Sequence, residues 1–574
     1  MRLIEIRLFE GPSVYRLAPA VKVELAVGRA RAWHGSRNPA STAMVSLARP
    51  VSARDWPDGV AEVVAWTRRL RTDHGEHAGP VHVHRAADTG RWIVTWPWTG
   101  AERAQLIAEA SVDLASRSVS AARRVRLTLT QVRHVERWTM RIGAASADPP
   151  SWIRDAERRM PVISVTGTNG KTTVTRLVTH ILLRAGHHVG TTTSDGILVD
   201  ERLVDAGDWT GPGGAAAVLR RPDVDIAVLE TARGGLVRRG MGYESNEVSV
   251  FTNVSADHLD LHGIHTLPEL AEVKATVCRV TRADGLVVLN ADDPLVAGVA
   301  RRVRARVGYF SIDPGRSAVI ARHRRAGGLA WVLLDGRLVE LDGDAEHRML
   351  EAAELPVALG GLARHNIANA LAAAGGARGL GATREQVADG LRDFRPSAAL
   401  SPGRLNLFRL GQRTVVIDFA HNEAGTEAIL QVAAAIAGGR PGRTAPVTAI
   451  IGTAGDRPDD SLRGIGRIAA RMADRVVIKE TLEYLRGRDR GAVVSLIADG
   501  IAEGGQDPAS VPVHETEVEA LAAELARDGG GATSDGQAAG PRVIVLFCHQ
   551  ERDAVFALLD RLGARQVDAA TGRP

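Results

Sequence analysis

The hydrophobic pattern of the first 150 residues mixes two periods. Three stretches alternate apolar and polar residues as half-buried strands do, and two have the spacing of amphipathic helices. The expected strands are Arg2–Phe9, Val21–Val27 and Trp92–Trp96, and the expected helices are Val60–Leu70 and Ala101–Leu114. This mixture predicts an α+β unit that ends at the linker-like stretch Ala144–Pro150.

A different pattern follows, in which short apolar runs alternate with helical stretches. The run VISVTG leads into a helix expected from Lys171 to Ala185, and the runs IAVLE, VSVFTNV and GLVVLNADD come later. Apolar strands connected by helices predict a parallel sheet covered on both faces. Residues 318–345 are expected to form a hairpin insertion, and the Ala-rich stretch Ile367–Gly375 a helix.

A second α/β unit is expected from Ser401 onward, with strands at TVVIDFA, VTAIIG, RVVIK and RVIVLF. The segment Asp528–Gly540 has the composition of a flexible surface loop. At about 150 residues per domain, the chain suits three domains. We expect an α/β protein with an N-terminal domain over 1–150, a central domain over 151–400 and a C-terminal domain over 401–574.

Composition narrows the classes of function. The net charge is +5 over 574 residues, and the basic side chains are mostly interleaved with acidic ones, which disfavours nucleic-acid binding. The N-terminus has no apolar signal core, and no apolar run approaches the ~20 residues that span a bilayer. Two cysteines, Cys278 and Cys548, make no disulfide framework. We therefore expect a cytoplasmic protein that binds neither nucleic acid nor membranes.

Lysine is scarce: only four of the 72 lysine and arginine residues are lysines. In such a chain a surface cation would usually be an arginine, so Lys171 and Lys274 are interpreted as retained for their chemistry. The same reasoning marks Lys479, at the end of an apolar strand, as a candidate substrate-side residue, whereas Lys22 is interpreted as incidental.

The segment TGTNGKTT, from Thr166 to Thr173, follows a buried strand and opens a helix. Its glycines let backbone N–H groups surround phosphates, and a helix N-terminus favours anions. Lys171 is placed to reach the terminal phosphates, and Thr172 occupies the position of a Mg²⁺-ligating hydroxyl. The spacing is shorter than G-x-x-x-x-G-K-[ST]. The strand before and the helix after favour a phosphate loop over a purely structural glycine turn.

This shortened loop resembles that of the Mur ligase family, and further motifs match that family in order. They are LETARGG around Glu230, NVSADHLDLHG from Asn253, LAEVK ending at Lys274, NADDP from Asn290, RHNIANA from Arg364, SPGRLNLF from Ser401, DFAHN from Asp418, TAGDR from Thr453 and LRGR from Leu485. LETARGG, GDWTGP from Gly207, NADDP and LRGR resemble the cyanophycin-synthetase-like branch. The resemblance covers about residues 160–574.

The resemblance implies a Mur-ligase-like P-loop central domain with a parallel sheet and a Rossmann-like C-terminal domain. It implies catalytic roles for Lys171, Glu230, His258 and Lys274, and Mg²⁺ ligation by Thr172, Glu230, His258 and a carbamylated Lys274. The implied ATP-binding residues are Gly167, Thr168, Asn169, Gly170, Lys171, Thr172, Thr173, Asn366, Asn369, Arg404 and Asp418, with His421 and Asn422 flanking the site. Taken alone, His258 would be read as a hydrogen-bonded loop histidine and the two asparagines as helix-capping or exposed residues.

The implied activity is that of an ATP-dependent ligase, which activates a carboxyl group as an acyl phosphate and joins it to an amine. The acid is expected to be an acidic peptide or a small carboxylic acid. Acidic residues of the last domain are candidates to recognise a cationic amine such as arginine, although an ordinary solvated face is equally compatible with them: Asp456, Asp459, Asp460, Glu480 and Glu483.

The segment MRLIEIRLFEGPSVYRL resembles the start of the N-terminal domain in the cyanophycin-synthetase-like branch. The ATP-grasp domain of that branch has no counterpart, because only about twenty residues separate the first unit from the phosphate loop, against the roughly 200 that such a domain needs. A separate ATP-grasp protein is therefore a candidate partner. The alternative function is an accessory, non-catalytic subunit for that enzyme, and a homo-oligomer is compatible with the sequence.

Two clusters in the first unit invite a functional interpretation. His74, His77, His82 and His84 lack the compact ligand spacing of closed metal sites. Trp92, Trp96 and Trp98 are expected to pack in a core or an interface. The basic run Arg123–Arg137 is interpreted as a solvated face rather than a contact for an acidic polymer.

Overall fold

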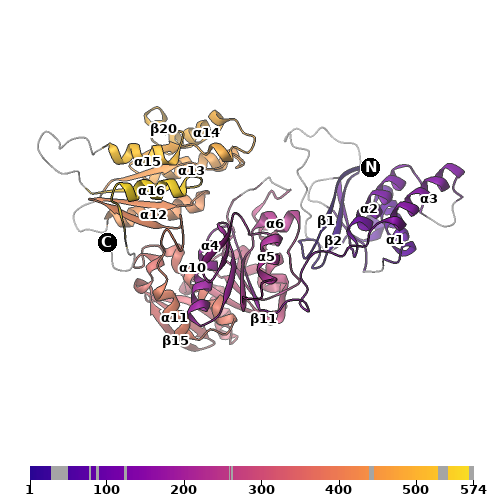
Figure 1. The fold of residues 1–574 in the computed structure, drawn as a ribbon, viewed down its shortest axis with the longest axis horizontal. Coiled ribbons are helices and arrows are strands. Elements are labelled where there is room, and N and C mark those ends of the chain that lie inside the picture. Colours follow the sequence, from indigo (N-terminus) through magenta and orange to yellow (C-terminus); the bar gives the residue numbers. More distant parts are fainter. Residues whose placement is uncertain are drawn as a thin grey trace, which may run out of the picture.

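The computed structural model describes residues 1–27, 50–76, 79–85, 90–121, 126–257, 259, 263–438, 445–527 and 541–567. It contains three sheets, each at the centre of its own layered unit. The units follow one another from the N-terminal one at one end of the molecule, through a central one, to the C-terminal one (Figure 1). The predicted α/β class is confirmed.

The N-terminal unit is an antiparallel four-stranded sheet in the order β1-β2-β4-β3, packed against helices. The predicted strands and helices are confirmed to within a few residues. The elements are β1 (Arg2–Phe9), β2 (Ala20–Ala26), a 3₁₀ turn (Ala53–Asp55), α1 (Asp58–Asp73), β3 (His82–Arg85), β4 (Arg91–Pro97), α2 (Ala101–Ser116) and α3 (Leu129–Ala144). Trp92, Trp96 and Trp98 are buried in the core of this unit, as expected.

Lys22 is not the incidental residue that the sequence suggested. Its side chain is fully buried on β2, where the ammonium donates to Glu24 at 2.7 Å and to Glu5 at 2.9 Å. A buried ammonium is stable only when it is paired in this way.

Backbone hydrogen bonds join the N-terminal unit to the central unit, from Glu10 N to Arg239 O and from Met241 N to Pro12 O.

The central unit is built on an eleven-stranded sheet in the order β15-β14-β13-β12-β11-β10-β5-β9-β6-β7-β8. The strands from β13 to β6 run parallel, as predicted, with antiparallel hairpins at both edges. Its strands are β5 (Val162–Thr166), β6 (Val189–Thr192), β7 (Gly196–Val199), β8 (Arg202–Ala206), β9 (Ile226–Glu230), β10 (Asn246–Phe251), β11 (Thr281–Asn290), β12 (Arg306–Ser311), β13 (Leu329–Leu334), β14 (Arg337–Asp342) and β15 (Ala345–Glu351).

Helices cover both faces of this sheet. They are α4 (Lys171–Arg184), α5 (Pro212–Leu219), α6 (Arg233–Arg238), α7 (Leu267–Arg279), α8 (Pro294–Ala297), α9 (Ala318–Arg325), α10 (Arg364–Gly379) and α11 (Arg384–Asp393), with 3₁₀ turns at Gly298–Arg302, Pro314–Arg316, Ala352–Glu354 and Pro356–Ala358. One core holds α4, α10 and α11 against the sheet, and another holds α5, α6 and α7. The strands β5, β9 and β10 therefore run buried through the middle layer, and their carboxyl ends meet at one edge.

The expected hairpin over residues 318–345 is wrong in its first half. Ala318–Arg325 is helix α9, and the hairpin is instead formed by β13 and β14. Ser317 caps α9 by accepting from Ile320 N, and four basic residues occupy its last turn, where cations favour a helix C-terminus. These terminal interactions stabilise a helix that alternation alone did not reveal.

The C-terminal unit has a seven-stranded sheet in the order β20-β19-β18-β21-β17-β16-β22. Its elements are β16 (Asn406–Leu410), β17 (Arg413–Asp418), α12 (Glu423–Gly438), β18 (Val447–Ile451), α13 (Asp459–Met472), β19 (Arg475–Lys479), α14 (Arg490–Glu503), β20 (Val513–His514), α15 (Glu517–Ala526), β21 (Arg542–Phe547), α16 (Arg552–Arg561) and β22 (Arg565–Gln566), with 3₁₀ turns at Leu482–Tyr484 and Pro508–Ser510. All four predicted strands are present. The predicted loop Asp528–Gly540 lies outside the described residues.

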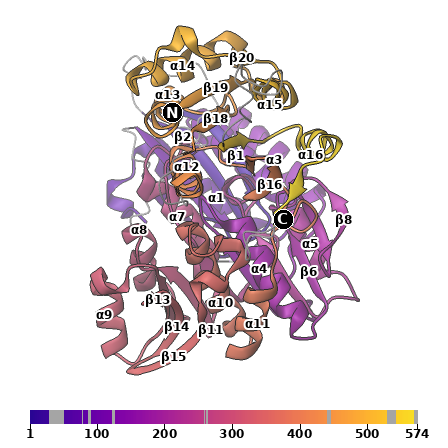
Figure 2. The same ribbon diagram turned by 90° about the vertical axis from the view of Figure 1, so that its left-hand side faces the viewer.

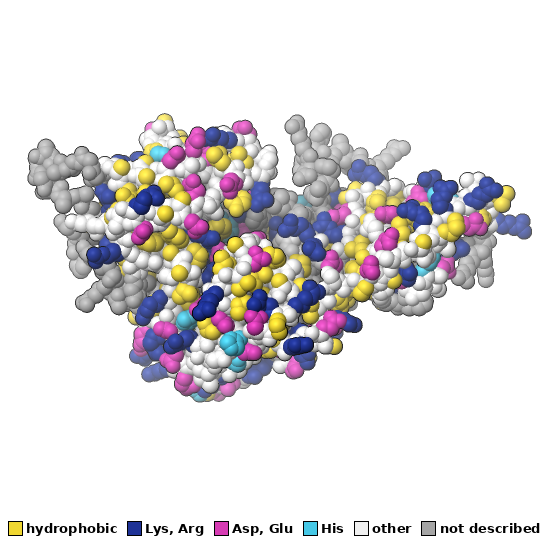
Figure 3. Space-filling model, in the orientation of Figure 1, with side chains coloured by type: hydrophobic (Ala, Val, Ile, Leu, Met, Phe, Trp, Pro, Cys, Tyr) yellow, Lys and Arg dark blue, Asp and Glu magenta, His cyan; other side chains and the backbone are white. Residues whose placement is uncertain are grey.

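The C-terminal unit stands over the carboxyl edge of the central sheet, with α12 above α10 (Figure 2). On the face drawn in Figure 3, basic and acidic side chains are interspersed, in keeping with the mixed charge of the sequence. Among the described residues, no helix is long and apolar enough to cross a bilayer. Cys278 and Cys548 are both buried free thiols.

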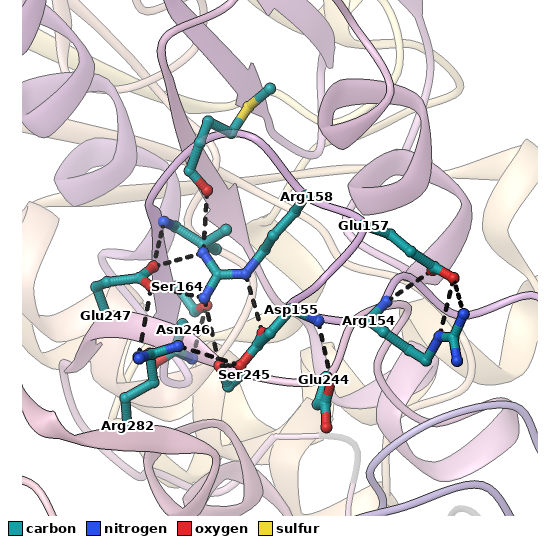
Figure 4. Close-up of polar contacts among 12 residues, drawn as sticks. Arg154, Asp155, Glu157, Arg158, Ser164, Glu244, Ser245, Asn246, Glu247 and Arg282 are labelled. Carbon is teal, nitrogen blue, oxygen red and sulfur yellow. Dashed lines mark hydrogen bonds and ion pairs between the residues drawn. The ribbon is translucent and has the colours of Figure 1, made fainter.

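A polar network anchors the linker before β5 to the amino-terminal edge of the central sheet (Figure 4). Arg158, whose side chain is 5% exposed, donates to both carboxylate oxygens of Glu247 at 2.6 and 2.7 Å and to Asp155 at 3.0 Å. Glu247 also accepts from Val162 N at 2.8 Å, at the start of β5. The linker and the strand that carries the phosphate loop are thus held by the same carboxylate.

We expect Arg158→Ala to lower the free energy of unfolding by about 2 kcal/mol, because it removes charge-assisted hydrogen bonds from a mostly buried site. Arg154→Ala is the matched control. Arg154 precedes Arg158 by four residues and pairs with Glu157, and both of these side chains are largely exposed. Solvent screens that exposed pair, so its loss should leave the free energy of unfolding close to that of the unsubstituted protein. Urea unfolding of the full chain measures both, and an equal loss in the two variants would contradict the anchoring role.

Candidate functional site

The phosphate loop joins β5 to α4 and lies tightly against its neighbours. Gly170 is the N-cap of α4, with φ +82°. A Cβ on Gly170 would lie 2.2 Å from Asn369 Oδ1, and one on Gly167 would lie 1.9 Å from Thr252 Oγ1. Both positions therefore require glycine, and the loop backbone packs directly against α10 and the end of β10.

The loop is also held by side chains that follow β10. Asn253 accepts from Asn169 N at 2.9 Å and donates to Asn169 O at 3.0 Å. Thr252 donates to the same carbonyl at 2.6 Å. The ammonium of Lys171 donates to Thr168 O at 2.8 Å, so it lies over the loop. These contacts hold the backbone of the loop in one conformation.

Glu230 and Thr172 bring hard oxygen atoms beside this loop. Glu230 ends β9 and is 3% exposed, and its Oε2 makes no hydrogen bond with the described residues. Burial raises the pKa of Glu230, although Lys171 and the hydroxyl of Thr172 oppose that shift. An unpaired buried carboxylate oxygen beside a hydroxyl suits Mg²⁺, which binds one or two carboxylates together with substrate phosphates.

Lys274 contacts the backbone of the phosphate loop. It lies on α7, is 4% exposed, and donates from Nζ to Gly167 O at 2.6 Å. Burial, reinforced by the charge of Lys171, lowers the pKa of Lys274 well below its usual range. This environment therefore disfavours the protonated form of the Lys274 amine.

His258, the remaining predicted metal ligand, lies outside the described residues, so its role stays a prediction. Within the described part of the chain, no three His, Cys, Asp or Glu side chains form a ready metal cluster. His77 of the N-terminal histidine group also lies outside the described residues.

The two asparagines of α10 are buried rather than exposed. Asn366 donates to Val357 O at 2.8 Å, and Asn369 donates to Asn366 Oδ1 at 2.9 Å. His365 lines the same cavity, and burial lowers its pKa to about 4. A neutral histidine and two amides make a polar, uncharged surface suited to a heterocyclic base.

Arg404 and Asp418 enter from the C-terminal unit. The guanidinium of Arg404 lies 4.4 Å from the centre of the Phe419 ring and donates to Ser194 Oγ of the central unit at 3.2 Å. Asp418, at the end of β17, accepts from Leu405 N at 2.8 Å. Burial raises the pKa of Asp418, and Arg404 opposes that shift.

These groups surround one cavity of about 440 Å³ between the central and C-terminal units. Most of the predicted site residues line it: Thr168, Asn169, Gly170, Lys171, Thr172, Thr173, Glu230, Asn366, Asn369, Arg404, Asp418 and His421. Gly167 and Lys274 do not line it, but they contact each other directly behind the loop. The fold therefore brings together residues that are up to about 250 positions apart in sequence.

Further contacts join the two units around the cavity. The amides of Asn169 and Asn422 exchange hydrogen bonds of 3.0 and 3.2 Å. Asp195 of the central unit pairs with Arg552 at 2.7 Å on one side. Asp257 pairs with Arg457 on the other side. The units are thus closed onto each other, with the phosphate loop at their junction.

Sequence reasoning missed several cavity residues. Ser194 lines the cavity and Asp195 pairs with Arg552 beside it; both come shortly after β6, and their signal was a polar pair that follows a buried strand of the parallel sheet. His365 precedes Asn366 in a motif that was recognised, and Phe419 follows Asp418 in another. The motifs could have identified these residues, but their contacts depend on how the C-terminal unit packs against the central unit.

The residues predicted to contact the substrates do not line the cavity. Lys479 does not line the cavity and is buried against Glu517. None of the five acidic candidates of the last domain lines the cavity either, and Asp459 and Glu480 pair with Arg488 and Arg490, each at 2.7 Å. An ordinary ion-paired surface accounts for these two carboxylates.

Comparison with known proteins agrees with this geometry. Residues 165–377 match the Mur ligase middle domain, and residues 403–533 match the Mur ligase glutamate ligase domain. The chain is 44% identical over 347 residues to a cyanophycin synthetase of Crocosphaera subtropica, covering 60% of this chain and 39% of that protein. It thus spans about two fifths of the length of that relative.

Two further relatives match over more of their own length. A UDP-N-acetylmuramoyl-L-alanyl-D-glutamate–2,6-diaminopimelate ligase of Alkalilimnicola ehrlichii is 30% identical over 416 residues, covering 71% of this chain and 74% of that protein. The Mycobacterium tuberculosis folylpolyglutamate synthase complexed with ADP superposes with a TM-score of 0.50 at 22% identity, covering 71% and 92% of the two chains, and shares the fold. The chain therefore belongs to the Mur ligase family of ATP-dependent ligases.

Proposed function

We propose that this protein uses ATP to join a carboxyl group to an amine through an acyl-phosphate intermediate. The observation that carries the proposal is the cavity in which the phosphate loop, Glu230 and the asparagines of α10 meet Arg404 and Asp418 of the other unit. Phosphoryl transfer depends on positioning and on charge stabilisation, and both are supplied by residues from two units.

ATP is proposed to lie along this cavity. The phosphates fit the amides of the loop, with Lys171 and Arg404 offsetting their charge, while Asn366 and Asn369 face the adenine and Asp418 the ribose. The distribution of charge supports this direction, because the cations lie at the loop and the α10 end is uncharged.

Mg²⁺ is proposed to be held by Thr172, Glu230 and the phosphates, with His258 and a carbamylated Lys274 at a second ion. When bound, the metal ions would neutralise charge that develops on the transferring phosphoryl group. The unpaired Oε2 of Glu230 supports the first site. The buried, neutral-favouring environment of Lys274 supports carbamylation, because CO₂ reacts with a free amine and not with an ammonium ion.

The reaction then has two steps. A carboxylate oxygen of the acid bonds to the γ-phosphorus, and ADP leaves. The nitrogen of the amine next attacks the acyl carbon, inorganic phosphate leaves, and the amine gives up a proton. Closure of the two units, as seen in the Asn169–Asn422 contact, would exclude water that otherwise hydrolyses the acyl phosphate.

The substrates are proposed from the family branch. The acid is an acidic peptide or a small carboxylic acid, and the amine is an amino acid or another amine, with an arginine-like amine among the candidates. We further propose the domain limits 1–150, 151–400 and 401–574, a cytoplasmic location, and a separate ATP-grasp protein as partner.

A substrate screen tests the proposal directly. Phosphate release from ATP and Mg²⁺ is expected to rise when an acidic peptide and an amine are supplied together, because neither alone completes the turnover. Lys171→Met should reduce this release at least about 100-fold by removing a cation from the phosphates. If no pair stimulates release and ADP does not bind, the ligase function is wrong.

Lys274→Arg tests the carbamate. We expect loss of ligation by at least about 100-fold with an unchanged melting temperature, because a guanidinium stays protonated and cannot capture CO₂. Arg279→Lys on the same helix is the matched control and should keep its activity, since Arg279 lies in a structural ion pair with Glu272. Near-normal ligation by Lys274→Arg would remove the carbamate from the mechanism.

A further inference from the structure

A buried triad of titratable side chains lies behind the cavity in the C-terminal unit. Lys479, at the end of β19, donates to Glu517 Oε1 at 2.5 Å and to His549 Nδ1 at 2.8 Å. The side chains of Lys479, Glu517 and His549 are 0%, 1% and 5% exposed. Such burial is costly unless every polar atom is paired, so the arrangement calls for a physical reason.

Glu517 organises the start of the segment after β21. Its carboxylate accepts from the backbone N–H groups of His549 at 2.6 Å and Glu551 at 2.9 Å, and from Cys548 Sγ at 3.1 Å. Burial disfavours the charged form, yet the charge of Lys479 and the donors around the carboxylate hold the pKa of Glu517 well below its usual range. Glu517 is therefore a carboxylate whose donors come from β19 and from the end of β21.

His549 connects Lys479 to the segment that lines the cavity. A lysine ammonium only donates, so His549 Nδ1 is an acceptor and Nε2 carries the proton. Nε2 then donates to Ala420 O at 2.9 Å. Burial and the charge of Lys479 lower the pKa of His549 well below its usual range, which preserves this neutral tautomer.

Ala420 lies in the middle of the segment 418–422, which carries cavity groups on both sides. Asp418, Phe419 and His421 line the cavity, and Asn422 bonds to Asn169 of the phosphate loop. The Phe419 ring also packs edge-on against the His549 ring, with centroids 5.1 Å apart. Fixing Ala420 O thus fixes the part of the C-terminal unit that meets the loop.

We infer that Lys479, Glu517 and His549 are positioning residues that hold the segment 418–422 against the nucleotide site through the hydrogen bond from His549 to Ala420 O. This inference rests on the proposed nucleotide site for its consequence, but the hydrogen-bonded geometry stands by itself. None of the three residues touches the cavity, so they act only through the segment.

The geometry also explains why this position kept a lysine in an arginine-rich chain. Gly452 packs so closely that a Cβ there would lie 2.8 Å from Lys479 Cε and 2.2 Å from Lys479 O. A planar guanidinium is wider than an ammonium and has a fixed fork of donors. The compact ammonium therefore fits between Glu517 and His549 where a guanidinium is too large.

Lys479→Met and Arg475→Met form a matched pair for the test. Both residues lie on β19 and both pair with a buried glutamate of α15, but Arg475 pairs with Glu524 at 3.0 Å, at the opposite end of the strand from the cavity. In the full chain, Lys479→Met should speed amide hydrogen exchange of residues 418–422 and raise the Kd for ADP, each by about tenfold. Arg475→Met should leave both near wild type, whatever its melting temperature.

His549→Gln and His549→Leu provide the second arm. Glutamine keeps a donor for Ala420 O and should retain most of the exchange protection and ADP affinity, whereas leucine should lose both. Equal effects of Lys479→Met and Arg475→Met, or of the two His549 variants, would overturn the positioning role. If wild-type protein does not bind ADP but the exchange differences appear, the triad holds the segment and the proposed nucleotide function fails.

Discussion

Close backbone packing around the phosphate loop is the constraint on which the site depends. Gly167 leaves no room for a side chain beside Thr252, and Gly170 none beside Asn369. Because the loop lies directly against the end of β10 and against α10, the protein itself fixes the loop backbone. Lys274 adds a contact behind the loop, at Gly167 O. A buried lysine whose pKa is strongly lowered is thus tied to the same backbone.

The C-terminal unit supplies the part of the site that the phosphate loop does not. The central sheet supplies anion-binding amides and carboxylate oxygen, and the C-terminal sheet supplies Arg404 and Asp418 from above. Paired charges flank the junction on both sides, Asp195 with Arg552 and Asp257 with Arg457. Parallel sheets place polar residues at their carboxyl edges, and two such edges facing each other make a site that neither has alone.

Lysine usage shows how far composition can lead. Scarcity pointed to Lys171 and Lys274, and both lie at the phosphate loop. The same scarcity was misread at Lys22 and Lys479, which are fully buried, Lys22 between two carboxylates and Lys479 between a carboxylate and a histidine. A common physical reason covers these two: a compact ammonium with three donors is satisfied by the acceptors around it in a buried site. Composition identified unusual positions, but only burial and partners distinguished chemistry from support.

The sequence by itself determined the local elements and the order of the motifs, because apolar periodicity and glycine placement act over a few residues. The parallel central strands, the loop-to-helix junction at Lys171 and the strands of the C-terminal unit were all predictable. Helix α9 was not, because its stability lies in a cap and a basic last turn rather than in alternation. The tertiary structure alone decided which side chains meet across the two units, such as Ser194 with Arg404, and which charges are buried, such as Lys479 with Glu517 and His549. Those outcomes depend on packing between segments that are distant in sequence, and no local pattern encodes a distance between them.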